Sequence, residues 1–175
     1  MSIKYQTIFI VDDDPMAADL LKDHLGKAST YKIEIFPTGE ECLKQLETVQ
    51  PGIIFLDYYL NSVDKDAMDG LEILQEIKEK SPETEVVMLS GQDKIEVAVN
   101  TMKYGAFDYI VKGESSFYRA EKSVFNIYRY RKLQGSATKY RNLSIYLGIT
   151  MVIMIGIVIY LNATGRITNM PGVHW

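Results

Sequence analysis

Five short apolar runs, each followed by residues with the spacing of an amphipathic helix, constrain the fold of this chain most. The runs are 8–11, 33–36, 53–56, 86–89 and 109–111, and Glu34 is the one charged residue among them. Residues 53–56 are apolar at every position, which is typical of a strand covered on both faces. Alternating strands and helices predict a parallel sheet between two helical layers, and right-handed crossovers leave few topologies. We therefore predict an α/β fold: a five-stranded, parallel, doubly wound sheet with five helices.

Local signals predict where the helices begin. Pro15 suits the first position of a helix, with Asp14 as its N-cap. Thr38 and Glu41 have the spacing of a capping box. A last helix of the domain is predicted over about 116–133. The predicted inward face of the first helix consists of Ala17, Leu20, Leu21 and His24/Leu25.

Charge is distributed unevenly along the chain, although the net charge is only −4. Residues 1–113 carry 11 Lys/Arg and 21 Asp/Glu, whereas residues 114–175 carry 8 and 2. The single cysteine excludes a disulfide framework and a multi-cysteine zinc site. Past Leu133 we find no helix-turn-helix pattern and no second catalytic domain. We therefore expect no nucleic-acid partner.

Polar side chains follow four of the predicted strands. In open parallel sheets, functional groups collect at the carboxyl ends of the strands, so these side chains would meet in one cleft. Crowded carboxylates require a compensating cation, and their hard oxygens suit Mg²⁺. A carboxylate beside Mg²⁺ can attack a phosphoryl group, whose oxygens an ammonium and a hydroxyl would bind. The strand-end residues are Asp12, Asp13, Asp14, Asp57, Ser90 and Lys112.

Five blocks of sequence resemble the receiver domain of bacterial two-component response regulators. Their correct order makes the resemblance, over roughly residues 5–134, highly specific. It implies a flavodoxin-like fold and a histidine-to-aspartate phosphorelay, with a histidine kinase or histidine phosphotransfer protein as phosphodonor. The blocks are Val11-Asp12-Asp13-Asp14-Pro15, Leu56-Asp57, Met68-Asp69-Gly70-Leu71, Met88-Leu89-Ser90 and Tyr109-Ile110-Val111-Lys112.

The resemblance implies a Mg²⁺ site and a phosphoacceptor. Asp57 would accept the phosphoryl group and also bind the metal. Asp13 would be a direct metal ligand, Asp12 would support the metal through water, and the backbone carbonyl of Tyr59 would be a further ligand. For Asp12 and Asp13 the alternative is a role as solvated loop-end caps. Asp14 fits a helix cap better than a metal ligand.

The resemblance also implies a switch. Lys112 would bind the phosphoryl oxygens, Ser90 would supply the switch hydroxyl, and Tyr109 would be the aromatic residue whose rotamer reports the switch. The alternative for Ser90 is that it caps the next helix. The alternative for Tyr109 is that it packs in the domain without acting as a switch. The protein would be a phosphoacceptor that assists its own phosphoryl transfer and autodephosphorylation, and not an enzyme.

Two departures from the family pattern occur beside this site. Gly70 lies thirteen positions after Asp57, where the corresponding glycine of the family usually lies eight positions after. The loop 61–67 is therefore longer and more polar than usual. Lys112 is followed by Gly113 instead of the family's proline. The longer loop bears on phosphodonor choice or on the lifetime of the phosphoryl group, and Gly113 bears on the direction in which Lys112 points.

Residues 143–161 form a stretch of 19 uncharged residues with no amphipathic stripe. As a helix it would be about 28 Å long, close to the thickness of a bilayer core. Seven Lys/Arg residues lie within 119–141, and only Arg166 follows the stretch, so the positive-inside rule places the receiver domain in the cytoplasm. We predict a single-pass transmembrane helix in the inner membrane. The alternative is an apolar helix docked on the domain or on a partner.

The predicted organisation has four parts. They are a receiver domain (1–134), a basic juxtamembrane linker (135–142), a transmembrane helix (143–161) and a short extracytoplasmic tail (162–175). Residues 134–138, at the start of the linker, are predicted to be flexible. The predicted function is a membrane-anchored, single-domain response regulator whose output is protein–protein contact, with a possible homodimer. The rival is a membrane-tethered, receiver-like scaffold that recruits partners without phosphorylation.

Overall fold

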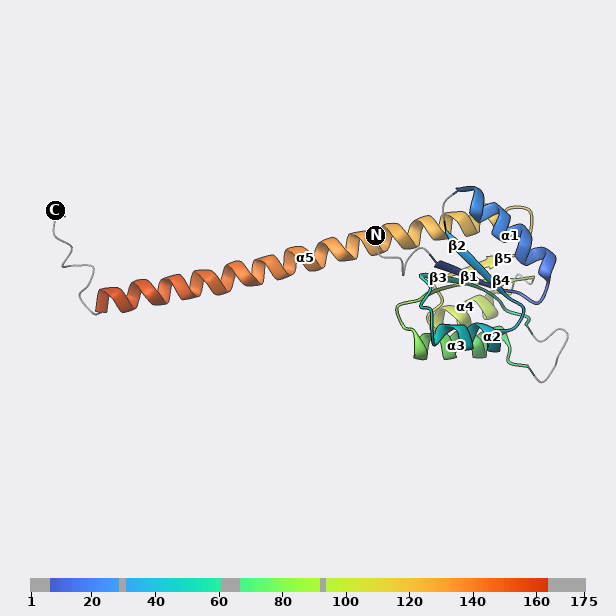
Figure 1. The fold of residues 1–175 in the computed structure, drawn as a ribbon, viewed down its shortest axis with the longest axis horizontal. Coiled ribbons are helices and arrows are strands. Elements are labelled where there is room, and N and C mark those ends of the chain that lie inside the picture. Colours follow the sequence, from blue (N-terminus) through green and yellow to red (C-terminus); the bar gives the residue numbers. More distant parts are fainter. Residues whose placement is uncertain (1–6, 29–30, 61–66, 92–93, 164–175) are drawn as a thin grey trace. The chain divides into compact units, whose positions relative to one another are not determined.

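The computed structural model describes residues 7–28, 31–60, 67–91 and 94–163. All five strands are parallel, in the order β2-β1-β3-β4-β5, so the predicted five-stranded parallel sheet is confirmed (Figure 1). The elements are β1 (Thr7–Val11), α1 (Pro15–Ala28), β2 (Lys32–Phe36), α2 (Gly39–Leu46), β3 (Ile53–Asp57), α3 (Gly70–Lys80), β4 (Glu85–Ser90), α4 (Ile95–Lys103), β5 (Asp108–Val111) and α5 (Ser116–Ala163).

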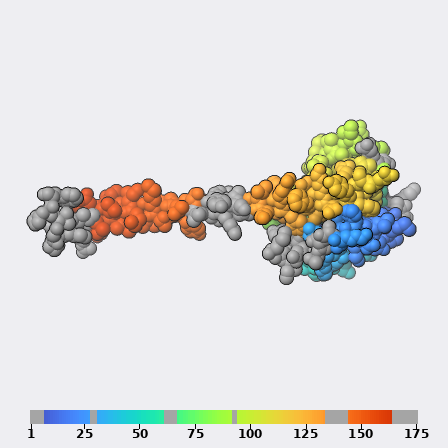
Figure 2. Space-filling view, turned by 90° about the horizontal axis from the view of Figure 1, so that it is seen from above, coloured from blue at the N-terminus to red at the C-terminus, as the bar shows by residue number. Residues whose placement is uncertain are grey.

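Helices cover both faces of the sheet. Figure 1 shows α1 and the beginning of α5 on one face, and α2, α3 and α4 on the other. Figure 2 shows α1 and the beginning of α5 side by side. Alternate strand residues point to opposite layers, because successive side chains of a strand project in opposite directions. The layer with α2 and α3 contains Phe9, Val11, Cys42, Leu43, Leu46, Ile54, Leu56, Ile73, Leu74, Ile77, Val86 and Met88.

The predicted start of α1 is confirmed, but its predicted inward face is wrong in part. The Asp14 carboxylate accepts hydrogen bonds from the backbone N–H groups of Met16 (2.9 Å) and Ala17 (3.3 Å), as an N-cap does. Leu20, expected inside, is 51% exposed. The apolar residues of α1 cover a wider part of the helix surface than the sheet can bury. The buried face is rotated by one residue from the predicted face. That buried face consists of Ala18, Leu21 and Leu25.

Helix α5 is longer than the sequence predicted. We expected a helix to about Leu133 followed by a flexible segment at 134–138, but α5 is helical from Ser116 to Ala163. The segment has no proline, and its one glycine, Gly135, costs a helix only about 1 kcal/mol relative to alanine. The segment predicted to be flexible is therefore part of α5.

The chain divides into two compact units, residues 1–127 and 128–175. The second unit contains Ser144–Ala163, with a mean hydropathy of 2.3 and no buried residue in its most apolar part. Among the described residues, this is the one helical stretch long and apolar enough to cross a membrane. The predicted tail lies outside the described residues from position 164 onward.

Candidate functional site

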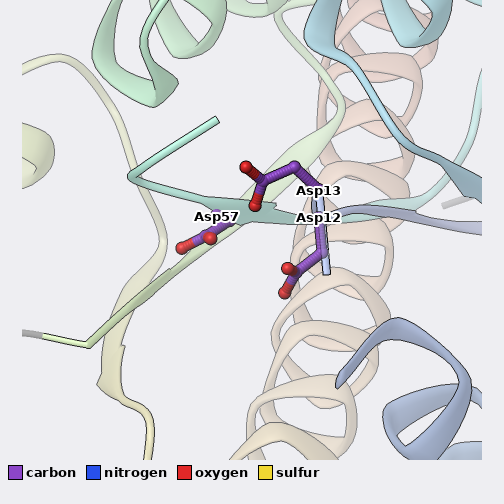
Figure 3. A group of neighbouring side chains, drawn as sticks. All are labelled: Asp12, Asp13 and Asp57. Carbon is purple, nitrogen blue, oxygen red and sulfur yellow. The ribbon is translucent and has the colours of Figure 1, made fainter. Parts of the chain in front are cut away.

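Three carboxylates meet at the carboxyl ends of neighbouring strands. Asp12 and Asp13 follow β1, and Asp57 is the last residue of β3, which pairs with β1. One oxygen from each residue lies within 4.8 Å of the others, and Figure 3 shows the three side chains gathered at one edge of the sheet. Asp12 and Asp57 are only 3% and 5% exposed, and Asp13 is half-buried. The strand order thus creates the acidic cleft that the sequence predicted.

Lys112 is the cation that the structure places against these carboxylates. Its Nζ donates to Asp12 Oδ2 at 2.8 Å and lies 2.9 Å from Asp57 Oδ2. Burial alone would lower the pKa of Lys112, but the hydrogen bond to Asp12 and the charge of Asp57 outweigh burial and raise it. Lys112 is therefore held as an ammonium ion between the two acids.

Asp12 is in a different electrostatic situation. Burial raises the pKa of its carboxyl group above the ordinary value, and the hydrogen bond from Lys112 opposes that rise. The other oxygen of Asp12 accepts the backbone N–H of Asp14 at 3.0 Å. Asp12 is thus fixed at both oxygens, which suits a group that orients a metal ion or its water.

The buried Asp57 Oδ1 has no hydrogen-bond partner among the described residues. A buried polar atom without a partner is costly, so it marks a place where another group is expected to bind. Mg²⁺ prefers oxygen ligands, typically one or two carboxylates with several waters. Asp13 and Asp57, with Asp12 behind them, therefore fit this ion. Receiver domains bind Mg²⁺ at an acidic pocket of this kind.

The predicted switch residues lie near the cleft on neighbouring strands. Ser90 is fully buried at the end of β4, and its carbonyl accepts the backbone N–H of Lys112 at 2.7 Å. The alternative that Ser90 caps the next helix is wrong, because α4 begins at Ile95 with Lys94 as its N-cap. Tyr109 is partly buried and packs against the core of the α2/α3 layer.

Tyr58, the residue after Asp57, is held by both β4 and α3. The backbone N–H of Tyr58 donates to Leu89 O at 2.8 Å, and the N–H of Gly70 donates to Tyr58 O at 3.0 Å. A Cβ atom on Gly70 would lie 2.2 Å from Asp57 O and 2.7 Å from Tyr58 Cα. Only glycine allows α3 to approach this closely. Despite the longer connection, Gly70 is therefore in direct contact with the proposed phosphoacceptor.

Tyr59, whose carbonyl was expected to bind the metal, is half-buried, and its ring packs edge-on against Tyr58 at 4.9 Å between centroids. Residues 61–66 of the longer loop lie outside the described residues. Shortly after this segment, the backbone N–H of Met68 donates a hydrogen bond to Glu40 Oε1 at 3.1 Å. Asp69 then caps α3 in a reciprocal box with Glu72.

A groove of about 240 Å³ adjoins the cleft between α1 and the beginning of α5. Lys112 and Gly113 form its polar end, next to Asp12. Its other wall is mostly apolar and includes Met16, Leu20 and Phe117, with Met16 72% exposed. The cleft is therefore open to a partner on its α1/α5 side.

The strand order 2-1-3-4-5, with an acidic site at the carboxyl ends, defines the flavodoxin-like class of α/β domains. Residues 8–117 match the family described as response regulator receiver domain. The matched region is more than half of the chain, so the protein belongs to this family. It is thus a receiver-domain protein of two-component signalling.

Relatives and solved structures agree with this assignment. The chain is 38% identical over 109 residues to nitrogen assimilation regulatory protein NtrX of Azorhizobium caulinodans, covering 60% of this chain and 22% of NtrX. It is 28% identical over 138 residues to transcriptional regulatory protein MalR of Bacillus subtilis, covering 78% and 55%. This chain thus spans between about a fifth and about half of these curated relatives.

Among solved structures, NtrX of Brucella abortus is similar with a TM-score of 0.64 and 30% identity, over 74% of this chain and 29% of NtrX. A CheY-like receiver domain protein of Methanospirillum hungatei has a TM-score of 0.63 and 27% identity, over 73% and 98%. In the second comparison the matched region covers nearly the whole of that solved chain.

Proposed function

We propose that this protein is a membrane-anchored, single-domain response regulator that accepts a phosphoryl group on Asp57. The observation that carries the proposal is the buried Asp57 Oδ1 without a partner, in a carboxylate whose other oxygen contacts Lys112. Asp12 and Asp13, which lie beside it, are the further residues proposed to hold Mg²⁺. Bound Mg²⁺ would neutralise negative charge on the carboxylates and on the incoming phosphoryl oxygens.

The proposed reaction forms one bond and breaks one. An Asp57 oxygen attacks the phosphorus of a phosphohistidine, the N–P bond breaks, and the released imidazole takes up a proton. Lys112 binds the phosphoryl oxygens, and Ser90 supplies a hydroxyl to them after a change of the β4 end. Hydrolysis of the resulting acyl phosphate returns Asp57 and inorganic phosphate. The protein therefore assists its own phosphorylation without acting on a separate substrate.

The proposed phosphodonor is a histidine kinase or a histidine phosphotransfer protein, the partners that receiver domains generally have. The groove beside Lys112 supports donor entry from the α1/α5 side, because its apolar side chains Met16 and Leu20 are exposed. Output is proposed to be protein–protein contact, including a possible homodimer, with no nucleic-acid partner.

A phosphoryl analogue distinguishes this function from that of a scaffold that is not phosphorylated. We expect the methyl NMR signals of Met88 and Ile110, buried residues of β4 and β5 near the strand ends that carry Ser90 and Lys112, to shift when Mg²⁺ and beryllofluoride are added together to the full chain in detergent micelles. Mg²⁺ alone should give smaller shifts, and beryllofluoride alone none. Unchanged spectra with both additions would favour the scaffold.

The membrane part of the proposal rests on Ser144–Ala163 and on the basic residues before it. This stretch has a mean hydropathy of 2.3, and 20 helical residues match the thickness of a bilayer core. Seven Lys/Arg residues within 119–141 favour a cytoplasmic receiver domain, with residues 162–175 on the other side. The proposed location is the inner membrane, crossed once.

Charged substitutions within the stretch test the anchor. We expect the full chain to remain with membranes after carbonate extraction and to enter the detergent phase. Lysine at both Ile153 and Ile157 should release most of the protein, because each charge at the centre of a span costs about 3 kcal/mol. Serine at the same two positions is the matched control and should keep the protein in the membrane. Recovery of the unsubstituted chain in the aqueous phase would contradict the anchor.

A further inference from the structure

In the part of the chain that the structure describes, the outer edge of β5 has no neighbouring strand. β5 is the last strand of that sheet and pairs with β4, with Tyr109 opposite Met88 and Val111 opposite Ser90. The peptide groups along such an edge need partners other than a strand. Lys112, which reaches Asp12 and Asp57, follows this edge strand directly.

At Tyr109, side chains make the hydrogen bonds that a neighbouring strand would otherwise make. The carbonyl of Tyr109 accepts a hydrogen bond from Arg119 Nη2 at 3.0 Å, and the N–H of Tyr109 donates one to Asp108 Oδ1 at 2.8 Å. The other oxygen of Asp108 accepts Ser123 Oγ at 2.5 Å. Arg119 and Ser123 are four residues apart and therefore share a face of α5. We name Asp108, Arg119 and Ser123 the β5–α5 latch.

The latch is anchored in packed structure. Ser123 is 2% exposed, and Ala120, Val124 and Ile127 on the same side of α5 are buried. Ser123 Oγ also lies 3.0 Å from Arg119 O, so the two latch residues of α5 contact each other. A buried hydroxyl on an ionised carboxylate makes a short, charge-assisted hydrogen bond. The first turns of α5 are thereby fixed to β5 by polar contacts in addition to packing.

We propose that the latch makes α5 follow β5, so that a change in the partners of Lys112 is passed to α5. The proposal rests on the proposed function, because phosphorylation of Asp57 is the event that would change those partners. The phosphoryl oxygens would draw the Lys112 ammonium away from its contacts with Asp12 and Asp57. The strand leading to Lys112 would move, and its edge is held by Arg119 and Ser123. These two are positioning residues that touch no phosphoryl oxygen.

A double-mutant cycle tests this coupling without requiring phosphorylation. Hydrogen exchange is measured in the full chain in detergent micelles, on peptides covering residues 119–133. We expect Lys112→Ala to change exchange there by about tenfold, the effect of one charge-assisted hydrogen bond. In an Arg119→Ala background the response to Lys112→Ala should largely disappear. Should Arg119→Ala fail to fold, Ser123→Ala takes its place in the cycle.

Matched variants show whether the latch itself carries the effect. Lys122→Ala, at an exposed position of the same helix, should leave the response to Lys112→Ala intact. Ser123→Thr keeps the hydroxyl and should retain most of the response to Lys112→Ala. A full response in the Arg119→Ala background, or no response in the otherwise unsubstituted chain, would overturn the latch. A response to Lys112→Ala without one to Mg²⁺ and beryllofluoride would support the latch and contradict phosphorylation of Asp57.

Discussion

Asp57→Asn is expected to reduce phosphoryl labelling by acetyl phosphate to background. The amide cannot supply the carboxylate oxygen that forms the acyl phosphate, and it removes one of the proposed metal ligands. Asparagine has nearly the same size and Lys112 keeps its 2.8 Å contact with Asp12, so the fold should be retained. The measurement is a phosphate-affinity gel of both proteins with Mg²⁺ and acetyl phosphate, with a thermal melt to confirm folding.

The matched control is Asp19→Asn, the same chemical change on the exposed surface of α1. It should be labelled like the unsubstituted chain. Asp57→Asn labelled to the same extent would show that phosphorylation occurs elsewhere, and the proposed role of Asp57 would be wrong. Loss of labelling only in Asp57→Asn, with an unchanged melting temperature, is the result that supports it.

Gly70→Ala is expected to be the most damaging single methyl addition in the domain. The new Cβ would lie 2.2 Å from Asp57 O and 2.7 Å from Tyr58 Cα, and both are backbone atoms that cannot rotate away. We expect a loss of about 3 kcal/mol in the free energy of unfolding, at the upper end of the usual cost of overpacking. Because the contact is on Asp57 itself, labelling by acetyl phosphate should fall even in the folded fraction.

Gly26→Ala is the control with the opposite expected sign. Gly26 lies within α1, and a Cβ there meets no atom within 4 Å. Alanine in a helix is favoured over glycine by about 0.5–1 kcal/mol, so this variant should be slightly more stable than the unsubstituted chain. Urea denaturation of the two variants measures both effects. Equal stability of Gly70→Ala and the unsubstituted chain would contradict the close approach of α3 to Asp57.

The sequence predicted the sheet well because the strands are short, mostly apolar and separated by clear helix signals. The run 53–56 lies within β3 (Ile53–Asp57), and Asp14 caps α1 as its position next to Pro15 suggested. Apolar periodicity was less reliable for judging burial. Leu20 continues the apolar stripe of α1 but is largely exposed, because the stripe is wider than the surface the sheet can cover.

The members of the acidic cleft were predictable because each follows a strand, and parallel strands end at one edge. The gathering of Asp12, Asp13, Asp57 and Lys112 follows from that rule once the strand order is known. Contacts between distant residues had no such signal. Nothing local in the sequence indicates that Arg119 would bond to the carbonyl of Tyr109, because that contact depends on how α5 crosses the edge strand.

The position of Gly70 was predictable only in part. The block 68–71 resembles the family pattern, but Gly70 lies thirteen positions after Asp57 instead of the usual eight. The structure places it against Asp57 despite the longer connection, because the contact depends on where α3 packs and not on the length of the loop. The continuous α5 was missed for a similar reason: Gly135 and its small neighbours suggested a linker, but the segment lacks the proline that would end a helix.

The contact of Lys112 with two of the three carboxylates also sets the charge balance of the cleft. With the acids ionised and Lys112 protonated, the cleft carries a net charge of −2. One divalent cation makes it electrically neutral, whereas one sodium or potassium ion leaves it negative. With Lys112 in place, the remaining negative charge of the cleft therefore equals the positive charge of a single Mg²⁺. Monovalent salt is expected to screen the charge of the cleft without replacing that ion.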